Sequence, residues 1–189
     1  CDPAPLETSM KHLMQPLLAA TLLLFATLPA NAASKEEIDA KVNEAKAELF
    51  KVSPAAQELA AKAAGILVFP KVTKGGIGIG GEFGEGALQI GGKTVAYYNT
   101  VAGSIGFQLG LQQKSQAILF MTKHELDKFQ KSEGWKAGVD GSVAIATLGA
   151  GGQIDTETAK KPIIGFIFSN KGLMYNLTFE GSKITKIDK

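Results

Sequence analysis

Residues 66–88 read ILVFPKVTKGGIGIGGEFGEGAL, and this stretch decides the fold class. Its glycines alternate with apolar or charged residues, whereas a nucleotide-binding loop would show one short glycine cluster. An alternation of period two is typical of β-strands. Glycine by itself weakens a strand, so its repetition on one face indicates that another backbone, a bend or a ligand approaches that face closely. The stretch therefore predicts close-packed β-structure.

The period of two continues to the end of the chain and predicts a sheet of many strands. Gly91-Gly92 and Gln113-Lys114 are predicted hairpin turns, and a last hairpin is predicted to turn near residues 170–172. The predicted strands are residues 66–69, 76–83, 87–90, 94–98, 104–112, 116–120, 142–147, 163–168, 173–179 and 183–187.

Two capping boxes mark the predicted helices. Ser34 with Glu37 opens a first helix that runs to about Lys51 and has apolar residues at helical spacing. Its charges are mixed, so we expect it to pack on its own sheet rather than on a membrane. Ser53-Pro54 opens a second helix, which is expected to end at Gly65. A third helix, opened by Thr122 and Glu125 and closed by Gly134, is expected to turn Leu126 and Phe129 inward, beside Trp135.

These patterns together predict an α+β fold. We expect an antiparallel, glycine-rich, curved or barrel-like sheet flanked by a few helices. No repeat or linker divides residues 33–189, which are therefore predicted to form a single domain.

Residues 10–32 have the pattern of a secretory signal peptide. Met10 and Lys11 precede the apolar run of residues 17–28, and Ala30-Asn31-Ala32 is a small-x-small cleavage site. We expect cleavage after Ala32 and export to the periplasm or cell envelope; an uncleaved anchor is the alternative. Residues 1–9 have no assigned role.

Composition excludes several chemistries for residues 33–189. This part contains no cysteine and one histidine, His124, so a disulfide framework, a thiol nucleophile and a multi-histidine metal centre are excluded. It has 19 lysines against 16 acidic residues, a net charge of +3, and no arginine. Arginine supplies the planar fork that reads guanine edges, so no nucleic-acid partner is expected. Attraction to an anionic surface remains open.

Several motifs have a structural explanation that is simpler than a catalytic one. Residues 87–94 match a loose phosphate loop, but a strand pattern follows where a helix is needed. Residues 76–81 match a dinucleotide glycine pattern, again without a helix. Ser104 lacks the spacing of a hydrolase nucleophile, and Glu82 and Glu85 are more simply solvated carboxylates than an acid/base pair. We therefore expect no enzyme, no catalytic residue, no metal and no cofactor. A hydrolase using these carboxylates or Ser104 is a weaker alternative.

The sequence resembles the SYLF domain family over most of residues 33–189. The resemblance lies in Val68-Phe69-Pro70, in the glycine-rich residues 74–86, in GSIGFQLG at 103–110, in SNKGL at 169–173 and in FEGS at 179–182. Two positions depart from the family pattern, Ile105 and Asn176.

The resemblance implies a non-enzymatic binding module that associates peripherally with anionic phospholipid or another amphiphile. The candidate contact surface is formed by three lysines with possible apolar contacts, namely Lys71, Lys74, Lys93, Phe69, Ile77 and Phe83. The alternative is a structural protein of the envelope that binds a protein partner, or itself, through a sheet edge.

Overall fold

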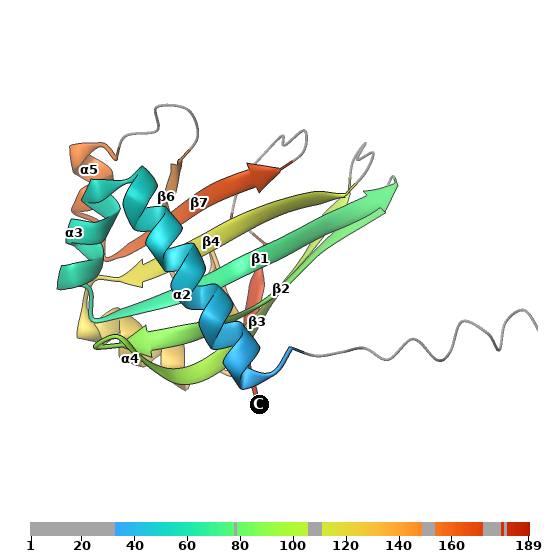
Figure 1. Ribbon diagram of the computed structural model, residues 1–189, viewed down its shortest axis with the longest axis horizontal. Helices are drawn as coiled ribbons and strands as arrows, with labels where there is room; N and C mark the ends of the chain where they lie inside the picture. The colour runs from blue at the N-terminus through green and yellow to red at the C-terminus, as the bar shows by residue number, and fades with distance from the viewer. Residues whose placement is uncertain (1–32, 78, 106–110, 149–153, 172–178, 180) are drawn as a thin grey trace, which may run out of the picture. The chain divides into compact units, whose positions relative to one another are not determined.

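The computed structural model describes residues 33–77, 79–105, 111–148, 154–171, 179 and 181–189. Ala33–Lys189 forms one compact unit, and it contains every described helix and strand (Figure 1). Because this unit has its own hydrophobic core, we expect the chain from Ala33 onward to fold by itself. The α+β prediction is confirmed. The described elements are α2 (Lys35–Val52), α3 (Pro54–Lys62), β1 (Gly65–Ile77), β2 (Ile79–Ile90), β3 (Lys93–Ile105), β4 (Gln112–Phe120), α4 (Lys123–Lys131), β5 (Trp135–Lys136), β6 (Ala144–Thr147), α5 (Thr156–Ala159), β7 (Ile163–Lys171) and β8 (Lys183–Ile187).

The sheet is curled and has eight described strands in the order β5-β8-β3-β2-β1-β4-β7-β6. Every described pairing between these strands is antiparallel except that of β6 with β7, which is parallel. The prediction of an antiparallel sheet is corrected at this one pair of strands.

Helix α2 packs on one face of the sheet, as predicted. Ser34 caps it by accepting a hydrogen bond from the Glu37 amide at 3.2 Å. Its buried side chains pack with alternate residues of β1, β2, β4 and β7. Polar contacts add to this packing, because Tyr97 donates a hydrogen bond to Asp39 at 3.0 Å and Lys46 donates one to Gln89 at 2.6 Å. We call this side of the sheet the α2 face.

Helix α4 packs on the opposite face of the sheet. Leu126 and Phe129 are buried, as predicted, and the Phe129 ring packs against those of Tyr98, Phe120 and Trp135 with ring centroids 4.9, 4.7 and 5.7 Å apart. Thr122 caps the helix through the Glu125 amide at 3.3 Å. The domain therefore has one hydrophobic cluster on each face of a single sheet.

Three turn predictions have different outcomes. Gly91 and Gly92 form the β2–β3 turn, with φ of 58° and 79°, which glycine adopts without strain. The turn predicted at Gln113-Lys114 is wrong, because both residues lie inside β4. The turn predicted near residues 170–172 lies partly outside the described residues. The strand predicted at 173–179 lies mostly outside them.

Several predicted strands are longer in the structure. The strand predicted at 66–69 continues through Pro70, which β1 includes within a bulge, as far as Ile77. The single strand predicted at 76–83 is wrong, because Ile77 ends β1, Ile79 begins β2 and these two residues are antiparallel partners. The second helix ends at Lys62 rather than at Gly65, because Gly65 already belongs to β1. Among the described residues, no helix is both long and apolar enough to cross a membrane.

Replacing Ser53 with alanine should destabilise the domain by about 1 kcal/mol. The Ser53 amide donates to the Leu49 carbonyl at the end of α2, and its buried side chain accepts from the Ala56 amide at 3.2 Å to start α3. Ser53 thus caps the end of α2 with its amide and the start of α3 with its side chain. Alanine keeps the amide hydrogen bond and loses the side-chain one. Urea denaturation of the two proteins measures the difference. An unchanged midpoint would show that the α2–α3 junction does not need the cap.

Candidate functional site

The pairing register of neighbouring strands shifts at about the same height along the sheet. The β1–β2 register shifts between Val68 and Lys71, and the β1–β4 register shifts between Phe69 and Val72. Pro70 lies inside both intervals and has no amide hydrogen for a ladder. The β4–β7 register also shifts, between Gln113 and Ser115. β-Bulges redirect side chains. The polar side chains described next lie at this level of the sheet.

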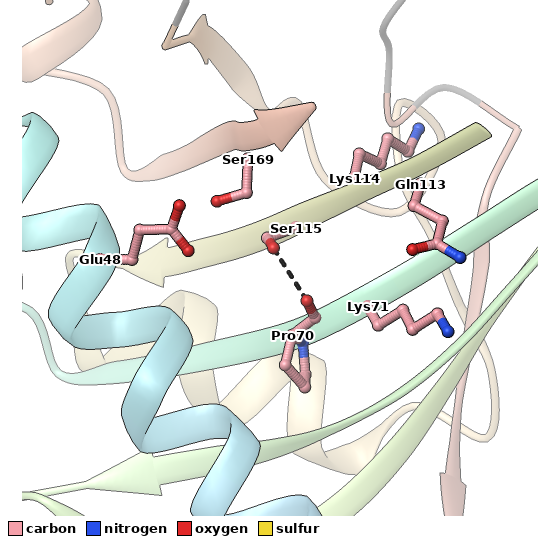
Figure 2. Close-up of a pocket in the computed structure, with 7 residues that line it drawn as sticks. All are labelled: Glu48, Pro70, Lys71, Gln113, Lys114, Ser115 and Ser169. Carbon is pink, nitrogen blue, oxygen red and sulfur yellow. Dashed lines mark hydrogen bonds between the residues drawn. The ribbon is translucent and has the colours of Figure 1, made fainter. Parts of the chain in front are cut away.

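A pocket of about 260 Å³ opens at these bulges, against helix α2. We call it the bulge pocket, and Figure 2 shows its lining. Its size is just below the range of about 300–1,000 Å³ typical of ligand sites, so it would suit a small group. It is lined by Glu48, Pro70, Lys71, Gln113, Lys114, Ser115 and Ser169.

The lining of the bulge pocket is polar and carries one acid and one available base. Ser115 Oγ donates a hydrogen bond to the Pro70 carbonyl at 2.8 Å. The Lys114 ammonium is 2.8 Å from Glu82, on the opposite face of the sheet, so it does not supply a charge to the pocket. Glu48 and Lys71 take part in no ion pair within the described part of the chain. They are the charged groups that a ligand could meet.

Ser169 is the strained residue of the pocket. Its φ of 55° lies in the left-handed region, which is uncommon for a residue other than glycine. Its buried hydroxyl has no hydrogen-bond partner among the described residues. In Figure 2 the hydroxyl is directed toward Glu48, so one end of the pocket combines a carboxylate with an unsatisfied hydroxyl.

A second surface lies where the strands extend past α2. The 13 residues of β1 span roughly 43 Å, whereas the 18 residues of α2 span about 27 Å, so part of the α2 face remains uncovered (Figure 1). Phe83 and Val101 are directly paired there and are 53% and 48% exposed. Leu111, 70% exposed, lies over Gly75 on the same side. We call Phe83, Val101 and Leu111 the distal face.

Lysines flank the distal face on both sides. Lys183 is paired with Val101 on β8, and Lys71 lies two residues before Thr73, the β1 partner of Phe83. Both lysines are exposed. Lys71 therefore borders the distal face and also lines the bulge pocket, so the two features are continuous.

The structure does not bring the six predicted contact residues together. Lys71 and Phe83 lie close to each other, as described above. Lys93 follows the β2–β3 turn, opposite Ile90, while Lys74 is opposite Glu82, so roughly 26 Å of strand separates them. Lys74 is nearly buried and 3.5 Å from Glu82. Phe69 is fully buried in the core and forms no surface, and the side chain of Ile77 lies outside the described part of the structure.

The two carboxylates considered for acid/base work lie on opposite faces of β2, because they are three residues apart in a strand. Glu82 pairs with Lys74 and Lys114, and Glu85 lies 2.8 Å from Lys189. The expectation of solvated carboxylates is corrected, because both are largely buried and ion-paired. His124 is exposed, and the side chain of Ser104 is outside the described residues.

The fold defines an α+β domain built on one curled, glycine-rich sheet. A family model described as "Ysc84: Las17-binding protein actin regulator" matches residues 101–189. This match to the Ysc84 (SYLF) family model confirms, over residues 101–189, the resemblance stated from the sequence. The match includes Val101 and Leu111 of the distal face and Gln113, Lys114, Ser115 and Ser169 of the pocket. No curated protein matches the chain.

Proposed function

We propose that this domain is a non-enzymatic binding module that attaches peripherally to a membrane of the cell envelope through its distal face. Its ligand in this proposal is anionic phospholipid or another amphiphile. The observation that carries the proposal is the paired, half-exposed Phe83 and Val101 beside the exposed Lys71 and Lys183. Apolar side chains rimmed by lysines suit the boundary between acyl chains and anionic headgroups.

Charge and apolar contact must act together in this proposal. One lysine near an anionic membrane contributes about 1 kcal/mol, so two lysines alone would bind more weakly than millimolar. Burial of apolar surface adds about 25 cal/mol per Å². Glycines at positions 75, 81 and 103 have no side chains to project beside the three apolar ones, which lets a broad surface approach.

The alternative, pairing with a protein through a sheet edge, has less support. Among the described strands, the sheet ends at β5 and β6, which have two and four residues. Short edge strands are a common protection against edge pairing. The family description, which names a Las17-binding actin regulator, keeps a protein partner as the second candidate class.

Replacing Phe83 and Val101 with serine should reduce membrane binding about tenfold, because most of the apolar contact is lost. The measurement is co-sedimentation of residues 33–189 with phosphatidylcholine vesicles and with vesicles that also contain phosphatidylglycerol, at low and high salt. We expect binding to the anionic vesicles, weaker at high salt.

The matched control is Val95→Ser compared with Val101→Ser alone. Both valines lie on β3 and are 49% and 48% exposed, but only Val101 belongs to the distal face. Equal binding by these two variants would contradict the assigned surface. Failure of the unmodified domain to bind any vesicle would favour a protein partner.

A further inference from the structure

The bulge pocket separates two opposite charges. Figure 2 shows the Glu48 carboxylate directed from α2 toward Ser115 and Ser169, while Lys71 and Gln113 extend toward the other side of the site. Within the described residues, neither Glu48 nor Lys71 has an ion-pair partner. An acid and a base that line the same pocket without pairing to each other can bind the two ends of one zwitterion.

The acidic end of the pocket favours a group that donates hydrogen bonds. A carboxylate only accepts hydrogen bonds, and the buried Ser169 hydroxyl lacks any described partner. A primary ammonium donates three hydrogen bonds, so it can donate to the Glu48 carboxylate and to the Ser169 hydroxyl oxygen at the same time. A quaternary ammonium carries the same charge but has no N–H to donate, so it would leave the hydroxyl unsatisfied.

The basic end of the pocket favours a small anion. The Lys71 ammonium and the Gln113 side-chain amide are hydrogen-bond donors, and charge-assisted bonds to a phosphate are among the stronger ones in proteins. Lys71 also borders the distal face, and Gln113 is paired with Thr73, the partner of Phe83. A phosphate held there would lie at the margin of the surface assigned to the membrane.

We propose that the bulge pocket binds a phosphoethanolamine group, with the primary ammonium at Glu48 and Ser169 and the phosphate at Lys71 and Gln113. This inference rests on the proposed function in that it takes the headgroup of a membrane lipid as the source. The same chemistry is also present in a free, soluble phosphoethanolamine ester. The pocket volume of about 260 Å³ suits a headgroup and leaves the acyl chains to lie outside, toward the distal face.

The first experiment uses soluble probes and needs no membrane. Glycerophosphoethanolamine and glycerophosphocholine are titrated into ¹⁵N-labelled residues 33–189, and amide shifts around the pocket give the dissociation constants. We expect the primary ammonium compound to bind about tenfold more tightly, because only it can satisfy the acceptors at Glu48 and Ser169. Equal constants, or no binding of either compound, would overturn the proposal.

Matched variants assign the two ends of the ligand. Glu48→Gln should remove the preference for the primary ammonium, while Glu44→Gln, an exposed carboxylate one turn earlier on α2, should preserve it. Lys71→Gln should weaken the binding of both compounds, while Lys93→Gln at the start of β3, opposite the far end of β2, should weaken neither. These substitutions are at exposed positions, so the variants are expected to fold. A preference that survives Glu48→Gln would contradict the assignment.

A vesicle experiment separates this proposal from the function on which it rests. Phosphatidylethanolamine replaces phosphatidylcholine in vesicles that keep a constant fraction of phosphatidylglycerol. Stronger binding that Glu48→Gln abolishes would identify the membrane headgroup as the source. Soluble discrimination without vesicle binding would support the pocket and reject the membrane function. Vesicle binding without any discrimination would support the membrane function and reject the pocket.

Discussion

Replacing Gly86 with alanine is expected to destabilise the domain by about 3 kcal/mol or more, at or above the upper end of ordinary overpacking. A Cβ at this position would overlap the Val68 carbonyl oxygen and lie 2.7 Å from Phe69 Cδ1. The obstacle is the backbone of β1, which cannot rotate away as a flexible side chain could. We expect little folded protein or a much lower urea midpoint, measured by circular dichroism.

The control for this prediction is Gly103→Ala. Gly103 also lies within a long strand, but a Cβ there would have nothing within 4 Å. Its φ is not in the left-handed region, so alanine should change stability by no more than about 0.5 kcal/mol. Similar losses of stability in the two variants would show that alanine is unfavourable at any strand glycine, and that the close approach of β1 is not the cause.

The glycine pattern was the part of the fold that the sequence predicted best. Repeated glycines on one face indicated a close approach, and the structure identifies it as the β1 bulge around Pro70, which crowds Gly84 and Gly86. A Cβ at Gly84 would be 2.8 Å from the Lys71 carbonyl oxygen. The helix caps at Ser34 and Thr122 were also predictable, because a cap depends on residues only three positions apart.

The distal face depends on strand register, which the sequence did not determine. From the correctly predicted Gly91-Gly92 turn, regular pairing would place Phe83 opposite Thr100. The register shift between Leu88 and Gln89 moves the partner to Val101 instead. A shift of one residue exchanges the two faces of a strand, so Val101 would have been assigned to the face opposite that of Phe83.

The bulge pocket was beyond the reach of sequence patterns for another reason. Glu48 lies on an exposed helix position, and Ser169 follows a buried strand segment far along the chain. Their approach follows from how α2 crosses the sheet and from bulges on two strands. Glu48 belongs to no motif, and Ser169 was noted only as the first residue of the SNKGL segment. The predicted turn at Gln113-Lys114 placed two lining residues in the wrong element.

Replacing Glu82 with glutamine should cost about 3 kcal/mol of folding stability or more, the range measured when one partner of a buried ion pair is removed. Glu82 is 2.8 Å from the Lys114 ammonium and 3.5 Å from that of Lys74. The Lys114 side chain is 1% exposed, so without the carboxylate its charge has no access to water. Urea denaturation at neutral pH measures the loss, and added salt should recover little of it, because buried charges are weakly screened.

Two comparisons make the Glu82 prediction specific. Glu37→Gln removes an ion pair whose side chains are both 50% exposed, so its expected cost is much smaller than that of Glu82→Gln. Adding Lys114→Met to Glu82→Gln should restore most of the lost stability, because the buried ammonium is then absent, while Lys74, 12% exposed, retains some access to water. If Glu82→Gln cost no more than Glu37→Gln, the Lys114 charge would have to be solvated or neutral in the folded domain. This face of the sheet would then tolerate unpaired polar groups. The ion pair would add nothing to the apolar core in holding β1, β2 and β4 together.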